Sequence, residues 1–129
     1  MTTVVTLSVW TFSDPGVASR AARTLRDLAG HRPVPVLDAA AVAWPRDAPR
    51  PVAQPVPGLS RDGADYAAVD WHRAGVRRDC SALFVLTTAA VVGRVHDALA
   101  AYRPRLRFVR VPGAPTALAA AVVLATPRG

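Results

Sequence analysis

Residues 81–86 read Ser-Ala-Leu-Phe-Val-Leu, and a continuous apolar run of this kind is typical of a strand in the middle of a sheet. The next segment has the spacing of a helix, with Val95 and Leu99 on its buried stripe and Pro104 at its end. Residues 105–111 begin by alternating arginine with apolar side chains, which fits a strand with one wetter face. This stretch therefore predicts a strand–helix–strand unit.

The same order of elements occurs nearer the start of the chain. Residues 4–12 are rich in β-branched and aromatic side chains, so they predict a strand. A helix follows that Gly30 can close, and residues 36–44 predict a second, alanine-rich strand. The two similar units, in the halves 3–44 and 80–111, indicate an internal pseudo-repeat.

Two such units pack most economically as an α+β, ferredoxin-like domain. It has a four-stranded antiparallel sheet with two helices on one face, and its first and third strands are central. The proline-rich connection 45–79 favours an extended arm or an irregular edge segment, with a short helix over 65–73. A last helix over 114–126 docks on this single domain of residues 1–129.

The composition excludes several classes of protein. All 16 basic residues are arginine, but they are spread along the chain and aromatic residues make up only 6%, which argues against nucleic-acid binding despite the net charge of +7. The one cysteine excludes an internal disulfide and a cysteine-rich zinc site. We expect no metal and no cofactor. Residues 4–12 are unlike a signal-peptide core, and the longest apolar stretch is too short for a membrane span. We therefore expect a cytoplasmic protein.

Few residues are candidates for catalysis. Asp70 and His72 place a carboxylate and an imidazole two positions apart, and Asp38 is a further group that could move a proton. None has the spacing of a metal site. Cys80 follows two arginines that would lower a thiol pKa, but without a neighbouring base it is more simply a packing residue at the start of a strand.

The uncovered face of the sheet is the stronger candidate for a site. In the first strand Val5, Leu7 and Val9 form one side, which we expect to pack on the two helices. The other side of that strand is mixed and must contact something else. The ligand or interface residues expected there are Thr6, Ser8, Trp10, Trp44, Arg105 and Arg107.

Two explanations of this face compete. Two sheets can pack face to face in a homodimer, or the tryptophans and arginines can form a pocket for a hydrophobic small molecule. The dimer is favoured, and both can hold together. We therefore expect a dimerising module that binds a partner protein or a small molecule and has no catalysis of its own. The alternative is a small cyclase or isomerase of secondary metabolism with a hydrophobic pocket on this face.

Two motifs carry a resemblance to a known family. Residues 38–45 (Asp-Ala-Ala-Ala-Val-Ala-Trp-Pro) and residues 81–87 (Ser-Ala-Leu-Phe-Val-Leu-Thr) resemble strands of a family of uncharacterised bacterial proteins described as predicted membrane proteins or domains of unknown function. The resemblance covers most of the chain and implies a fold but no chemistry. The family's long glycine-rich hydrophobic insert is replaced here by about twenty residues around 58–65, so no functional residue is carried over.

Overall fold

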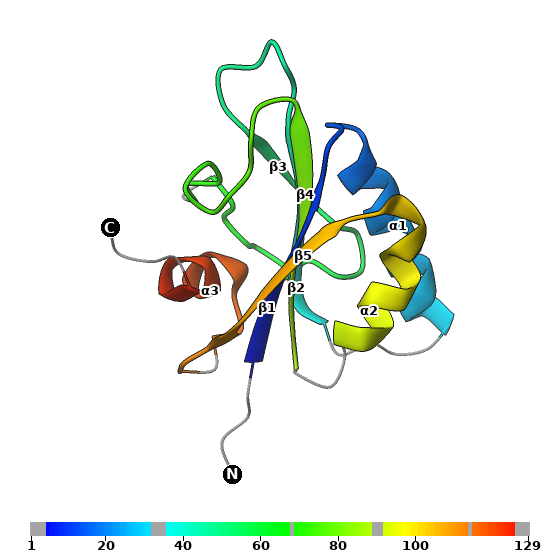
Figure 1. The fold of residues 1–129 in the computed structure, drawn as a ribbon. Helices are drawn as coiled ribbons and strands as arrows, with labels where there is room; N and C mark the ends of the chain where they lie inside the picture. Colours follow the sequence, from blue (N-terminus) through cyan, green and yellow to red (C-terminus); the bar gives the residue numbers. More distant parts are fainter. Residues whose placement is uncertain (1–4, 32–35, 68, 89–91, 114, 126–129) are drawn as a thin grey trace.

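The computed structural model describes residues 5–31, 36–67, 69–88, 92–113 and 115–125 (Figure 1). The elements are, in chain order, β1 (Val5–Phe12), α1 (Val17–His31), β2 (Val36–Trp44), β3 (Val52–Pro55), β4 (Cys80–Thr88), α2 (Val92–Leu99), a 3-10 turn (Ala100–Tyr102), β5 (Arg105–Val111) and α3 (Leu118–Ala125). None of the helices in the described ranges is long and apolar enough to cross a membrane.

The strands form one antiparallel sheet in the order β3-β2-β4-β1-β5. The predicted α+β class is confirmed, and β1 and β4 lie inside the sheet as expected. The expectation of four strands is wrong, because residues 52–55 of the connection pair with residues 40–43 of β2 and extend the sheet at its edge.

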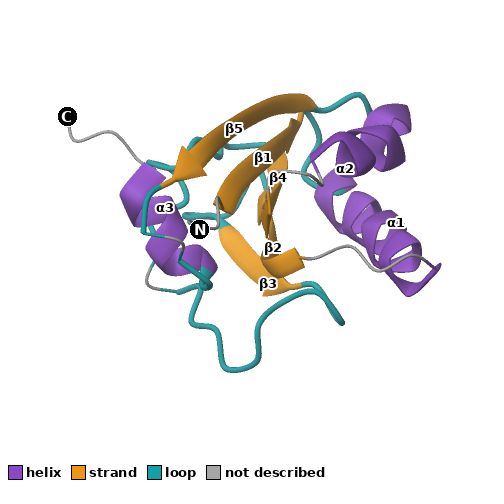
Figure 2. Ribbon diagram, turned by 90° about the horizontal axis from the view of Figure 1, so that it is seen from below, coloured by secondary structure: helices purple, strands orange, loops and turns teal. Residues whose placement is uncertain are grey.

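Both faces of the sheet are covered (Figure 2). Helices α1 and α2 pack on one face, and α3 lies on the other together with the loop between β3 and β4. The buried residues of the α3 side are Val5, Leu7, Val9, Ala40, Val42, Tyr66, Trp71, Ala74, Val76, Ala82, Phe84, Leu86, Val111, Leu118, Ala121 and Val122. The fold therefore has two hydrophobic cores separated by the sheet.

The predicted assignment of the β1 faces is wrong. The aliphatic side of β1 packs against α3, whereas Trp10 faces α1 and α2, with its indole ring 6.1 Å from the His96 ring. This mixed side tolerates burial because the polar atoms of Ser8 and Trp10 are paired internally. The Trp10 indole N–H donates to Ser8 Oγ (3.0 Å), and Ser8 Oγ donates to the Val85 carbonyl (3.2 Å).

The part of the connection that carries Tyr66, Trp71 and Val76 is a loop packed on the α3 face. Its aromatic residues are buried, with Trp71 edge-on to Phe84 of β4 at 4.8 Å and donating its indole N–H to the Tyr66 carbonyl (3.2 Å). The helix expected over 65–73 does not occur in the described part of this segment. The side chains of Asp65 and Asp70 instead accept backbone N–H bonds two and three residues ahead, which stabilises turns in competition with a helix.

Candidate functional site

A groove of about 660 Å³ lies at the end of the sheet where β1 stops and β4 and β5 start. It is bounded by these strand ends, by the turn before β5 and by the last residues of the connection. The lining residues are Val9, Thr11, Phe12, Ser13, Gly75, Val76, Arg77, Cys80, Ser81, Arg103, Arg105, Leu106 and Arg107. They combine apolar walls with a high density of hydrogen-bond donors.

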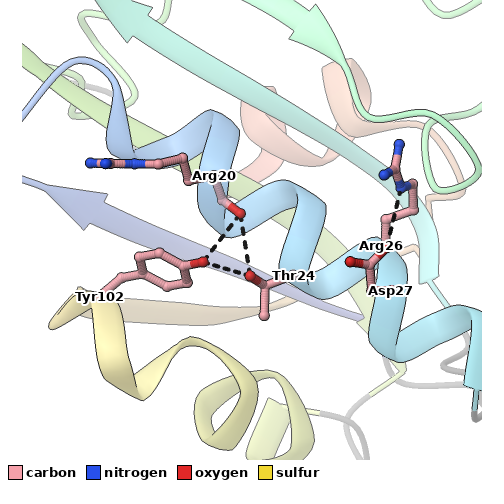
Figure 3. A network of polar contacts seen from close by, with 5 residues as sticks. All are labelled: Arg20, Thr24, Arg26, Asp27 and Tyr102. Carbon is pink, nitrogen blue, oxygen red and sulfur yellow. Dashed lines mark hydrogen bonds and ion pairs between the residues drawn. The ribbon is translucent and has the colours of Figure 1, made fainter.

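Four arginines give the groove its charge. Arg77 comes from the connection, Arg103 from the turn before β5, and Arg105 and Arg107 from β5 itself. No carboxylate side chain belongs to the described lining. Arg26–Asp27 and His96–Asp97 are two side-chain ion pairs of the described ranges, and both lie on helices away from the groove (Figure 3 draws the first). The groove is therefore a concentration of positive charge without an acidic counterpart of its own.

Arg107 is held in place by a glycine. Its Nη2 donates to the Ala74 carbonyl (2.7 Å), and the guanidinium lies against Gly75. A Cβ at Gly75 would be 3.2 Å from Nη2 of Arg107, and the backbone there has a φ of +109°, which disfavours any residue with a side chain. Gly75 therefore fixes where this cation stands at the wall of the groove.

Arg103 is positioned by the turn that ends the second helical segment. The Tyr102 hydroxyl is 2.6 Å from Thr24 Oγ1, and both groups contact the Arg20 carbonyl of α1 (Figure 3). This anchor precedes Arg103, which adopts a left-handed conformation with a φ of +53° and donates its N–H to the Ala100 carbonyl (3.1 Å). The strained turn directs the chain from α2 into β5 at the groove.

The other polar side chains of the groove differ in whether they are already engaged in hydrogen bonds. Ser81 Oγ is engaged, since it donates to the Asp14 carbonyl (2.6 Å) and accepts from the Ala18 N–H (3.1 Å), which ties the start of α1 to β4. The Cys80 thiol is free and half-buried. No histidine or aspartate stands in the described lining to act as a base. The arginines of the lining are suited to holding an anion.

Asp38, a predicted catalytic candidate, is instead a buried structural centre. Its carboxylate is fully buried and accepts four hydrogen bonds, from Ala39 N (2.9 Å), Arg61 N (3.0 Å), Tyr66 Oη (2.6 Å) and Leu118 N (2.8 Å). The last bond places a negative charge at the N-terminus of α3, where the helix dipole favours it. Asp38 thereby joins β2, the connection and α3, and it does not reach the groove.

Asp70 and His72 are exposed on the connection and lie apart from Asp38. The His72 ring contacts Trp44 edge-on at 5.4 Å, and Asp70 caps a turn. The structure does not bring the three candidates together, and none of them lines the groove. The described residues contain no group of three or more histidine, cysteine or acidic side chains placed to hold a metal.

The expected ligand or interface residues are divided between the two faces. Thr6, Ser8 and Trp10 are buried beneath α1 and α2, so the open face predicted for them does not exist. Arg105 and Arg107 pair with Thr11 and Val9 of β1 and hence lie on the opposite side from Trp10.

Trp44 is half-buried on the α3 side of the sheet, where it supports the connection. Its ring lies 4.9 Å beneath the Arg78 guanidinium, and its indole N–H donates to the Ala48 carbonyl (3.0 Å). Sequence reasoning missed Arg77 and Arg103 as partners of the β5 arginines, because turns in separate segments bring them to the groove and no local pattern records that.

Tyr66, which donates a hydrogen bond to Asp38, makes the stability of the fold depend on pH. Burial and the hydrogen bond to the Asp38 carboxylate raise the pKa of Tyr66 to about 12. The unfolded chain loses this proton near the ordinary tyrosine pKa of about 10, so the Tyr66 contribution to stability is complete below that pH and is lost as the pH rises toward 12. We expect urea unfolding to show about 2 kcal/mol less stability at about pH 11.5 than at about pH 9. The same loss in Tyr66→Phe would contradict this assignment.

Comparisons with models of known protein families, with curated proteins and with solved structures found no match.

Proposed function

We propose that this chain is a non-catalytic binding module that holds a small organic anion with an apolar body in the arginine groove. The observation that carries the proposal is the cluster of four arginines around about 660 Å³, in a lining without a carboxylate among its described residues. The binding role expected from the sequence is kept, but its place moves from the face of the sheet to the sheet's end. Arg105 and Arg107 remain central to it.

The chemistry of the lining supports an amphipathic anion. Guanidinium groups donate paired hydrogen bonds that match the oxygens of a carboxylate or a phosphate. Phe12, Val76 and Leu106 provide apolar wall beside these donors. A volume of this size is in the ordinary range of small-molecule sites, which combine apolar surface with a few polar anchors.

Phenyl phosphate is a suitable probe, because it joins an aromatic ring to a phosphate. Amide chemical shifts should move around the groove when it binds. Arg77→Gln and Arg105→Gln should each weaken the binding about tenfold, since each removes charge-assisted hydrogen bonds. The matched control is Arg50→Gln, an exposed arginine outside the groove that should bind as the wild type does. Equal weakening in all three variants, or equally strong binding of phenol, would overturn the proposal.

The enzymatic alternative, a small cyclase or isomerase, has less support. Its candidate residues Asp38, Asp70 and His72 stand outside the groove, and a proton-transfer group must reach the atom on which it acts. The observed lining favours recognition.

Dimerisation stays part of the proposal, on a different surface. Helix α3 carries no charged residue, yet Val123 and Leu124 on it are 73% and 51% exposed. An apolar helix without a polar face favours coverage by a partner, and a second copy presents the same surface. We expect light scattering to show twice the monomer mass for the wild type and the monomer mass for Leu124→Asp. A monomeric wild type would contradict the dimer.

We also propose that the fold is ferredoxin-like. We describe β1–α1–β2 and β4–α2–β5 as a ferredoxin-like pair to which β3 and α3 are added, supported by the order β2-β4-β1-β5 within the sheet. Membership of the resembled bacterial family and a soluble, cytoplasmic state are part of the same proposal.

A further inference from the structure

The two edges of the sheet differ in how open they are to another strand. The edge strand β3 has four residues, ends at Pro55 and is preceded by Pro51, so prolines block both ends of its backbone. The opposite edge, β5, has seven residues and no proline within it, and Pro104 and Pro112 lie just outside its ends. The outward N–H and C=O groups of such a strand form a template for pairing with a further chain.

Positive charge marks the β5 edge. Arg105, Arg107 and Arg110 are all exposed, and the strand carries no acidic residue. Neither the Arg26–Asp27 nor the His96–Asp97 ion pair involves this strand. Between these charges Val109 is 38% exposed, which is high for a valine in a sheet. The edge thus presents an ordered series of cationic and apolar positions.

We infer that β5 binds an extended acidic segment of a partner protein as an additional antiparallel strand. Backbone pairing supplies affinity in this mode, and the alternating side chains supply specificity. Acidic residues opposite Arg105, Arg107 and Arg110 and apolar residues opposite Leu106 and Val109 would complement the edge. Antiparallel pairing continues the pattern of the sheet and is the more stable arrangement.

Charge favours an acidic peptide over the other molecules that could bind at the β5 edge. A second copy of β5 would bring three arginines from each strand together without one acidic side chain on either. A nucleic acid would satisfy the arginines, but it does not offer the alternating donors and acceptors that a strand edge requires. An acidic peptide satisfies both the charges and the backbone.

The inference goes beyond the small-anion site and is separable from it. Arg77 lines the groove but is not on β5, and Arg110 is on β5 but does not line the groove. Arg77→Gln should weaken phenyl phosphate binding about tenfold and leave peptide binding unchanged, and Arg110→Gln should do the reverse. Failure of one proposal therefore does not imply failure of the other.

The probe is a synthetic peptide of the length of β5 with the order threonine, aspartate, valine, threonine, aspartate, valine, aspartate, capped at both ends. At about 1 mM peptide we expect changes in amide chemical shift that are concentrated in residues 105–111. Two N-methylated versions, one modified at odd and one at even positions, are the main controls. Only the version whose modified amides face β5 should lose binding, because only those amides donate to the edge.

Four outcomes would overturn the inference. They are the absence of shifts in 105–111, equal binding by all three peptides, equal binding by a peptide with lysine in place of aspartate, and tighter binding by an oligothymidylate that competes with the peptide. Light scattering of the free protein with Arg110→Gln beside the wild type detects self-pairing through β5, since a dimer that depends on this edge would also contradict it.

Discussion

Asp38→Ala is expected to lower the free energy of unfolding by about 4 kcal/mol, the largest effect of a single polar substitution in this chain. The substitution removes the acceptor for three backbone N–H groups and one hydroxyl, in a place where the carboxylate is fully buried. Each buried donor left without a partner costs about 1–3 kcal/mol. Urea denaturation followed by tryptophan fluorescence measures the change.

Two milder variants keep this prediction testable if Asp38→Ala fails to fold. Asp38→Asn retains one side-chain oxygen but presents an N–H group to donors, so we expect a loss of about 2 kcal/mol. Tyr66→Phe removes only the hydroxyl and should cost about 1 kcal/mol. Both variants should unfold cooperatively, and Tyr66→Phe should be the more stable of the two. A fully stable Asp38→Ala protein would mean that the carboxylate has no structural role.

Trp10→Arg is expected to unfold the chain. Trp10 is fully buried under α1 and α2, and its indole N–H is bonded to Ser8. A guanidinium there would lose the packing of a large aromatic side chain, about 3–5 kcal/mol, and would also bury an unpaired charge. Circular dichroism and a proteolysis time course should show loss of the native state.

This experiment distinguishes the buried position of Trp10 from the open-face position expected from the sequence. If Trp10 lay on an open face, Trp10→Arg would yield a folded monomer from a dimer, and light scattering would show it. The conservative Trp10→Phe should remain folded with a loss of about 1–2 kcal/mol, because it keeps a smaller aromatic ring and loses the indole N–H bond to Ser8. A folded Trp10→Arg protein would contradict the buried position.

The elements of the two halves could be predicted because their signals are local. The strand over 36–44 and the strand over 105–111 have the predicted bounds, and β1 and β4 differ from the prediction by a residue or two at their ends. Hydrophobic periodicity also separates the two faces of β1 correctly. It does not tell which face meets which helix, because both faces are buried and the polar atoms near Trp10 are satisfied within the sheet.

The candidate site was predictable only in part. Arg105 and Arg107 share a face of β5, as their spacing requires, and they do line the groove. Their association with Trp10 was wrong because it depended on the face assignment. The role of Asp38 was hidden for a different reason. Its donors come from residues 23 and 80 positions away in the chain, and no local motif encodes such contacts.

The bond from Leu118 to Asp38 has a consequence for synthesis on the ribosome. β2 and its carboxylate emerge early, but the N–H group that completes the site is made 80 residues later. Until α3 has emerged from the exit tunnel, the apolar side of β1 and β4 lacks part of its cover. A chain in which α3 has not yet docked therefore exposes apolar surface of β1 and β4 that the folded protein buries.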